Sequence, residues 1–145
     1  MNERNEVKIG VGAGGVLLGM NADEVISTLG NDYQKESFEE EKLFYLSYYK
    51  QGIAVAFTNN LVDVIFLYSG LVGGYETGQF QRFECQIAPS ITMDATYEEV
   101  IDVFGQPLKE GDLSGADIPS KWLHYEGIGF NFVIESGQII YISIS

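Results

Sequence analysis

Two segments, NADEVISTLG (residues 21–30) and TYEEVIDVFG (residues 96–105), decide the fold because they are two versions of one pattern. A shift of 75 residues superimposes them and places Glu24 on Glu99. Agreement at one offset, in several kinds of residue and over much of the chain, predicts a tandem duplication. The same shift also aligns later positions: Gly52 and Ile53 with Gly127 and Ile128, Phe57 with Phe132, and VIF (64–66) with IIY (139–141).

Each of the two segments has the start and stop signals of a short helix. Asn21 and Thr96 are N-cap residues, and a glutamate three positions later completes a capping box in each. Apolar residues then recur at helical spacing and form one apolar face of each predicted helix. A glycine, at position 30 or 105, ends the helix. We therefore predict two helices of about two to three turns each.

A polar loop (31–42 or 106–121) follows each predicted helix, and segments with strand patterning come next. The turns between strands, NN at 59–60 and ESG at 135–137, are suited to hairpins. One unit is thus a helix, a loop and an antiparallel meander of about three strands. The predicted strands are LFYLSYY (43–49), GIAVAFT (52–58) and LVDVIFLY (61–68), and then WLHYE (122–126), GIGFNFVI (127–134) and QIIYISI (138–144).

We predict an α+β protein in which two tandem helix-plus-antiparallel-meander repeats form one continuous sheet with the helices on one face. Residues 1–71 are the first repeat unit and residues 72–145 the second, within one compact domain. Neither unit alone has enough apolar surface for a substantial core.

The glycine-rich stretch VKIGVGAGGVLLG (7–19) matches G-x-G-x-x-G at Gly10, Gly12 and Gly15. In a dinucleotide-binding fold the glycine turn leads directly into a helix, and a parallel strand follows. Here the predicted helix starts six residues after Gly15, and a meander follows it. We therefore interpret the stretch as a turn or bulged edge strand leading into the helix, and we expect no cofactor.

Charge and cysteine content limit the classes of partner. The formal net charge of −13 disfavours binding to nucleic acid or to an anionic membrane, and is consistent with a basic protein partner. Cys85, the single cysteine, cannot form an internal disulfide. No apolar run reaches the roughly 20 residues that span a bilayer, and residues 1–8 lack the positive region of a secretory signal. We expect a cytoplasmic protein.

Catalytic and metal-binding patterns are weak. Cys85 and His124, the single histidine, are the only candidates for a nucleophile–base pair. The shift of 75 residues aligns His124 with Tyr49, so the same position in the first unit has no imidazole. The acidic loop at 39–41 and the segment GDLSGAD (111–117) lack the ligand spacing of a calcium loop. We predict no catalytic residue, no metal and no enzymatic activity.

The alternation within the central strands indicates two unlike faces. Residues 53–58 and 128–133 place large apolar side chains on one face and small ones on the other. The bulky face is expected to pack under the helices. Extending the pattern to the neighbouring strands places Tyr45, Tyr49, Trp122 and His124 on the open face as candidate partner-binding residues. The alternative is that these rings pack on loops at the sheet edge.

The order of segments along the chain consists of the helix motifs GMNADEVISTLG and MDATYEEVIDVFGQP, followed by a loop, a W-x-x-Y segment, a G-I-x-F-x-F segment and a final strand. This order resembles the β-lactamase-inhibitor-protein-like fold. That fold is a tandem of two such units with a concave sheet. The pattern is also similar to the small outer-membrane assembly lipoproteins, which carry one copy. The resemblance implies protein–protein binding through the concave sheet, without catalysis. The secreted inhibitors have a disulfide in each half and the lipoproteins have a lipidated cysteine, whereas this chain has Cys85 alone.

The sequence therefore predicts a non-enzymatic module that binds or inhibits another protein through the concave face of its sheet. A bacterial immunity-type protein that neutralises a basic toxin is one form of this hypothesis. The alternative function is a small-ligand carrier. Its pocket would lie between sheet and helices or at the repeat junction near Gly73 and Gly74.

Overall fold

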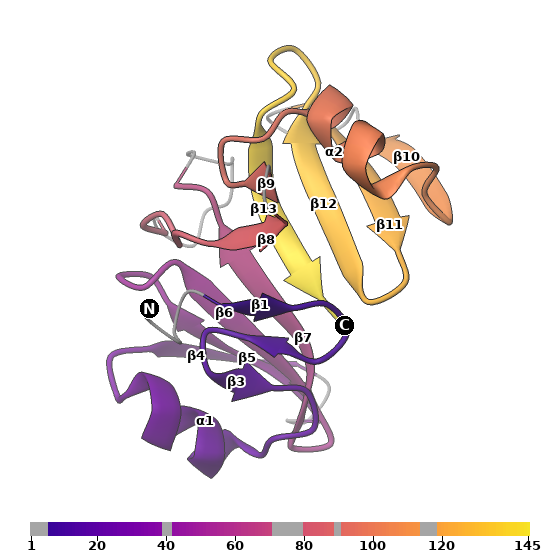
Figure 1. Cartoon of the computed structure of the whole chain (residues 1–145). Helices are drawn as coiled ribbons and strands as arrows, with labels where there is room; N and C mark the ends of the chain where they lie inside the picture. The colour runs from indigo at the N-terminus through magenta and orange to yellow at the C-terminus, as the bar shows by residue number, and fades with distance from the viewer. Residues whose placement is uncertain (1–5, 39–41, 71–79, 89–90, 114–118) are drawn as a thin grey trace.

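The fold is mainly antiparallel sheet with two short helices, so the α+β class is confirmed (Figure 1). A computed structural model describes residues 6–38, 42–70, 80–88, 91–113 and 119–145. The helices are α1 (Ala22–Leu29) and α2 (Tyr97–Phe104). Within these described ranges, neither helix is long and apolar enough to cross a membrane.

Eight strands form one antiparallel sheet with the order β10-β11-β12-β13-β7-β6-β5-β4. The strands β13 and β7 are neighbours and join two four-stranded meanders. The strand bounds are β4 (Gln34–Phe38), β5 (Leu43–Tyr48), β6 (Ile53–Thr58), β7 (Leu61–Tyr68), β10 (Lys109–Leu113), β11 (Ser120–Tyr125), β12 (Ile128–Val133) and β13 (Ile139–Ile144).

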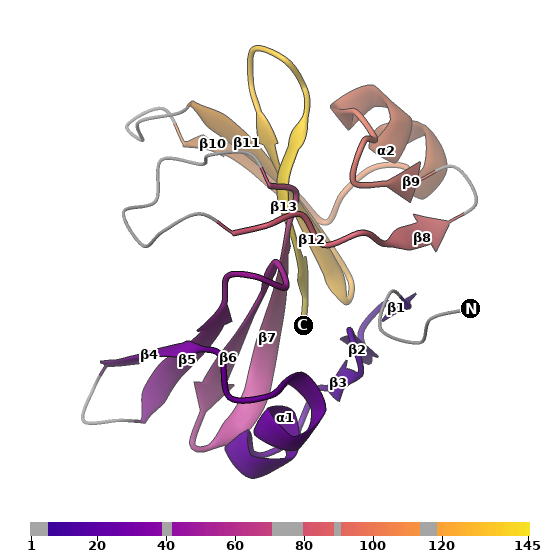
Figure 2. The same cartoon turned by 90° about the vertical axis from the view of Figure 1, so that its left-hand side faces the viewer.

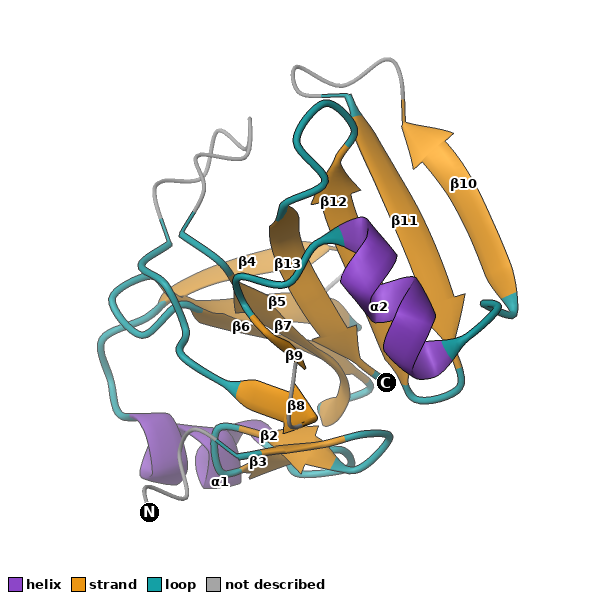
Figure 3. Cartoon of the chain, turned by 45° about the horizontal axis from the view of Figure 1, so that its top comes forward, coloured by secondary structure: helices purple, strands orange, loops and turns teal. Residues whose placement is uncertain are grey.

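The glycine-rich stretch forms a small sheet of its own, with β1 (Val7–Lys8), β2 (Gly12–Ala13) and β3 (Val16–Leu17). We expected a loop or a bulged edge strand there. Gly10, Gly14 and Gly15 have φ angles of 72°, 65° and 86°, so they supply the tight turns between these strands. A second small sheet, β8 (Gln86–Ala88) and β9 (Ile91–Thr92), lies close by in the fold (Figure 3).

The helices and both small sheets lie on the same side of the large sheet (Figure 2). Figure 2 also shows that the large sheet bends about β7 and β13, so that β4 and β10 both lie on the side away from the helices. The buried apolar cluster contains Val25 of α1, Val100 of α2 and Phe83, together with alternate side chains of the large sheet. The core therefore fills the space on the helix side. The face on the inside of the bend is called the open face below.

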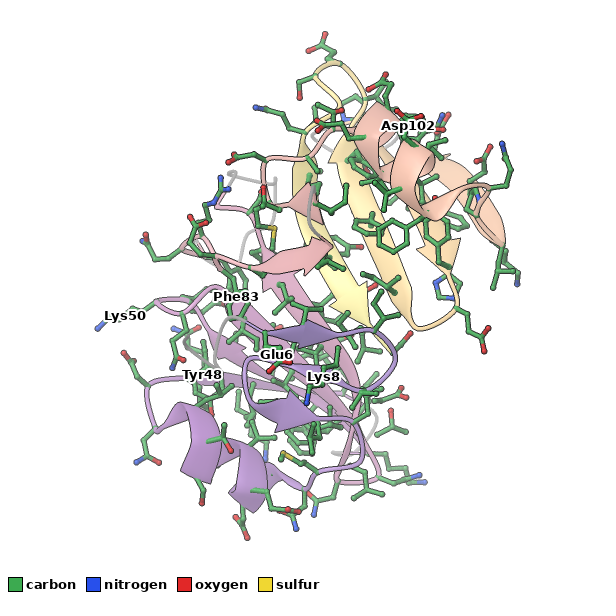
Figure 4. All side chains as sticks on the ribbon, viewed as in Figure 1. Glu6, Lys8, Tyr48, Lys50, Phe83 and Asp102 are labelled. Atoms are coloured by element: carbon green, nitrogen blue, oxygen red, sulfur yellow. The ribbon has the colours of Figure 1, made fainter. Side chains whose placement is uncertain are left out.

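Both helices begin and end in the same way. Each has the predicted capping box, from Asn21 in α1 and from Thr96 in α2. At the other end, the Tyr48 hydroxyl (Figure 4) donates to the carbonyl of Gly30 at 3.0 Å. The Tyr125 hydroxyl donates to the carbonyl of Gly105 at 2.9 Å. Burial raises the pKa of Tyr48 to about 12, with Tyr33 nearby adding to the effect, so this donor stays protonated well into the alkaline range.

The two tyrosines that make this bond are 77 residues apart, whereas the glycines that accept it are 75 apart. The turn between β5 and β6 spans residues 49–52, and the turn between β11 and β12 spans only 126–127. The alignment of Tyr49 with His124 is therefore wrong. In the strand pairing Ser47 lies opposite Ala54, as His124 lies opposite Gly129.

The regions predicted as polar loops contain the two edge strands, β4 and β10. Most side chains of both strands are exposed, and the strands read QKESF and KEGDL. Charged residues on an edge strand discourage pairing with other chains, but they also remove the apolar alternation by which a strand is recognised. Each meander consequently has four strands rather than about three.

We expect Tyr48→Phe and Tyr125→Phe each to lower the free energy of unfolding by about 1 kcal/mol, because each leaves a part-buried carbonyl at a helix end without its donor. Urea denaturation followed by circular dichroism would measure this. Tyr97→Phe is the matched control: the Tyr97 ring packs on Phe132 at 5.6 Å, and its hydroxyl makes no hydrogen bond within the described part of the chain. An equal loss in all three variants would contradict a capping role for the two hydroxyls.

Candidate binding face

Small side chains occupy the middle strands of the open face. Ala54 and Ala56 lie on β6 and are 2% and 3% exposed. Gly129 and Asn131 occupy the corresponding positions on β12. The expected contrast between a bulky helix-side face and a small-residue open face is therefore present in both strands. Of these residues, Ala54 lines a cavity above the sheet.

Aromatic rings surround the small residues of β6. Pairing places Tyr45 opposite Ala56 and Phe66 opposite Ala54, and it also pairs Tyr68 with Tyr141 across the β7–β13 joint. Seven rings form one connected series, called the aromatic chain below. Successive centroid distances are Phe38–Tyr45 5.9 Å, Tyr45–Phe66 6.2 Å, Phe66–Tyr141 5.5 Å, Tyr141–Tyr68 5.9 Å, Tyr68–Phe80 3.8 Å and Phe80–Tyr49 4.5 Å.

Six of the seven rings, all except Tyr49, line a surface groove of about 330 Å³. The floor of this groove includes Ala54 and Ser47, and one carboxylate, Glu36, lies at the β4 side. We call this cavity the β4–β13 groove. Its volume falls at the small end of the range of pockets that bind ligands, roughly 300–1,000 Å³.

Three of the four predicted partner-binding residues lie on the open face in regular strands. Tyr45 is half-buried and is part of the aromatic chain. Trp122 and His124 lie on β11, opposite Asn131 and Gly129 of β12, and His124 is exposed. The structure thus groups Tyr45 with the groove, whereas Trp122 and His124 lie on the other half of the same face.

Tyr49, the fourth predicted residue, lies in the turn after β5 rather than in the strand. Its ring is half-buried and packs on Phe80 at a centroid distance of 4.5 Å. The Tyr49 hydroxyl is buried and has no hydrogen-bond partner among the residues that the structure describes. Tyr49 therefore ends the aromatic chain instead of lying beside Tyr45.

The Trp122 indole covers Gly111 of the neighbouring edge strand. A Cβ atom built on Gly111 would lie 2.7 Å from Trp122 Cζ2 and 2.9 Å from Nε1. These distances are too short for any side chain, so the glycine allows the ring to lie against the backbone of β10. Trp122 is half-buried as a result.

Sequence reasoning did not identify Phe38, Phe66, Tyr68, Phe80 and Tyr141 as site residues. Four of the five lie in strands, where alternation places Phe66 and Tyr68 on the face opposite the buried Ile65 and Leu67. The pattern within β7 was sufficient to find these two. The pairing of Tyr68 with Tyr141 depends on which strands are neighbours, and a single sequence does not give that.

Cys85 and His124 do not come together. Cys85 belongs to the buried cluster on the helix side, and His124 is exposed on the open face. Burial, the larger cause, and the nearby Glu84 raise the pKa of the Cys85 thiol to about 12. A thiol in this state is a poor nucleophile at neutral pH. In the part of the chain that the structure describes, no group of three or more histidine, cysteine or acidic side chains is placed to hold a metal ion.

Several sequence expectations fall on residues outside the described ranges. These are the acidic loop at 39–41, part of the GDLSGAD segment at 114–117, and the repeat junction near Gly73 and Gly74.

Comparisons with models of known protein families, with curated proteins and with solved structures gave no match.

Replacing Gly111 with alanine is expected to displace the indole of Trp122, because the new Cβ would occupy its place. Trp122 is the single tryptophan, so its fluorescence emission should shift to longer wavelength as the ring moves into water. Stability should fall by less than about 1 kcal/mol, since the ring can move outward at the surface. The neighbouring Asp112→Ala variant should leave the emission unchanged. An unaltered spectrum in Gly111→Ala would show that the indole does not cover this position.

Cys85 should react with a thiol reagent at pH 7.5 at least tenfold more slowly in the folded protein than in 6 M urea, because folding both buries the thiol and raises its pKa. Stopped-flow absorbance with Ellman's reagent measures both rates. A folded-state rate equal to or above that of the unfolded chain would indicate an activated thiol and would reopen a catalytic role.

Proposed function

We propose that this chain is a non-enzymatic protein-binding or inhibitory module that binds another protein through the open, concave face of its large sheet. The observation that carries the proposal is the aromatic chain. Seven rings are connected, and six of them line the β4–β13 groove on the open face. The strands of the large sheet turn this face away from both helices and both small sheets (Figure 2). Aromatic side chains with polar atoms are enriched in the energetically dominant parts of protein interfaces.

Rigidity supports the same proposal. The open face is backed by paired strands, and its central residues are fixed by the core on the opposite side. A partner loop that enters the bend would therefore meet a preorganised surface and would cost less ordering entropy on binding. The mechanism is occlusion: the bound loop is no longer accessible to the partner's own substrate or target.

The charge of the chain indicates the kind of partner. A formal net charge of −13 raises the rate of encounter with a basic protein and opposes encounter with an acidic one. An immunity-type protein that binds a basic toxin is the specific form of the proposal that this charge favours.

We also propose that residues 1–71 and 72–145 are two copies of one helix–meander unit, in the arrangement of the β-lactamase-inhibitor-protein-like fold. Two capping boxes and two tyrosine–glycine bonds at the helix ends support this. The pairing of β7 with β13 supports it as well, because Ile65 pairs with Ile144 and Leu67 with Ile142. A shift of 77 residues places Ile65 on Ile142 and Leu67 on Ile144, so it turns the first pair into the second.

The second candidate function is a small-ligand carrier, and the β4–β13 groove is the observation that favours it. The groove lies on the open face, not between sheet and helices, which was the first of the two locations expected from the sequence. The second, the repeat junction near Gly73 and Gly74, lies outside the described residues. A carrier would bind its ligand without a protein partner, so a thermal-shift screen of small aromatic and amphipathic compounds separates the two functions.

Site-specific photo-crosslinking in the source cells tests the proposal. A benzoylphenylalanine at His124, exposed on the open face, should give adducts with a protein partner. The same residue at Asp102, exposed on α2, is the matched control and should give none (Figure 4). Adducts from both positions in equal amount, or from Asp102 alone, would contradict binding through the open face.

Trp122→Ala and Tyr49→Ala should each weaken capture of the crosslinked partner, with a loss of about 2 kcal/mol if these rings are interface hot spots. Val103→Ala is the control, because Val103 is 45% exposed and lies on α2, on the other side of the large sheet. The midpoint of thermal unfolding should change little in all three. A large drop in the midpoint for Trp122→Ala would instead assign the ring to the fold.

A further inference from the structure

The β4–β13 groove has walls that are mainly aromatic. Tyr45, Phe66 and Tyr141 line it together with Tyr68 and Phe80, which stack on each other with ring centroids 3.8 Å apart. The face of an aromatic ring carries partial negative charge, so a cation that stacks on such a face is attracted to it.

Glu36 gives the groove its formal charge. It is half-buried on β4, where it pairs with Tyr45 of β5, and it is the one charged side chain among the described residues that line the cavity. The nearest lysine along the chain, Lys35, lies on the other side of the sheet, with its Nζ 4.7 Å from the centroid of the Phe44 ring in the core. The carboxylate is thus not neutralised by its neighbour in sequence.

The corresponding position in the second meander lacks this carboxylate. Gly111 pairs with Trp122 as Glu36 pairs with Tyr45. The indole lies against Gly111, which has neither a carboxylate nor space for one. The negatively charged groove is therefore a feature of one half of the open face.

We propose that the β4–β13 groove binds an arginine side chain from a loop of the basic protein partner. The guanidinium stacks on the aromatic walls and forms an ion pair with Glu36. This inference rests on the proposed function, because it specifies what the open face recognises. Charge complementarity carries it: a mainly aromatic lining, one carboxylate and a chain with a formal net charge of −13 all favour a cation.

The geometry favours arginine over lysine. A guanidinium is planar, stacks on aromatic faces and is less strongly hydrated than an ammonium group, so it loses less on entering an apolar groove. Its two parallel N–H groups also match the two oxygens of a carboxylate. A cavity of about 330 Å³ accepts one long side chain on a floor made of Ala54 and Ser47.

Titration of the full chain with acetyl-arginine-amide, followed by NMR, tests the inference without knowledge of the partner. The probe should bind with a dissociation constant in the millimolar range, and its side-chain methylene protons should shift upfield in the ring currents. Acetyl-citrulline-amide, which has nearly the same shape but no charge, should bind roughly tenfold more weakly. Acetyl-lysine-amide (free side-chain amine) should bind with intermediate strength. Added salt should weaken binding of the charged probes.

Two variants locate the binding. Glu36→Gln should weaken acetyl-arginine-amide roughly tenfold, and Phe66→Leu should weaken it and remove most of the upfield shift. Glu110→Gln is the matched control, since it removes the same charge from the other edge strand, outside the groove. Thermal unfolding of each variant checks that it is folded.

Equal binding of the arginine and citrulline probes would overturn the inference, as would the absence of detectable binding at 20 mM probe or equal effects of Glu36→Gln and Glu110→Gln. Failure here is distinguishable from failure of the proposed function. A partner that crosslinks at His124 and binds Glu36→Gln with unchanged affinity leaves the open face as the interface and removes only the arginine site. Absence of any partner at His124 removes the proposed function, whatever the probe does.

Discussion

The pairing of β7 with β13 is the constraint on which the rest of the structure depends. It is the joint at which two four-stranded meanders become one eight-stranded sheet. On the helix side the joint is made by Ile65, Leu67, Ile142 and Ile144, all of which are 0% exposed. Full burial of such a side chain contributes roughly 1.5–3 kcal/mol. Neither meander could keep these residues out of water alone, so the joint and the core form together.

The register of the β7–β13 pairing also determines what lies on the open face. Side chains alternate along a strand, so fixing Ile65 and Leu67 in the core places Phe66 and Tyr68 on the opposite side. Tyr68 then meets Tyr141 across the joint. A slip of one residue would exchange the buried aliphatic side chains with the aromatic ones. The register that stabilises the fold is therefore also the register that assembles the aromatic chain.

Much of this architecture could be predicted from the sequence, because the signals are local. Capping boxes, glycine stops and the alternation of large and small residues in β6 and β12 depend on neighbours within a few positions. The edge strands could not be predicted, since exposed strands carry no apolar alternation. The different turn lengths before β6 and β12 were also missed, and they moved Tyr49 out of the strand in which it was expected. The contacts of Phe80 were missed because they depend on tertiary structure.

The two halves of the core contain the same tyrosine–glycine hydrogen bond, whereas the two halves of the open face have different side chains at corresponding positions. On the core side, Tyr48 and Tyr125 keep the same bond to a helix end, because loss of either leaves a part-buried carbonyl unsatisfied. No such penalty applies on the open face, where one half pairs Glu36 with Tyr45 and the other pairs Gly111 with Trp122. Such a fold can change one half of its surface without altering its core. The result is a groove with a carboxylate on one half and an indole that covers Gly111 on the other. Under the proposed function, this asymmetry would distinguish one end of a bound loop from the other.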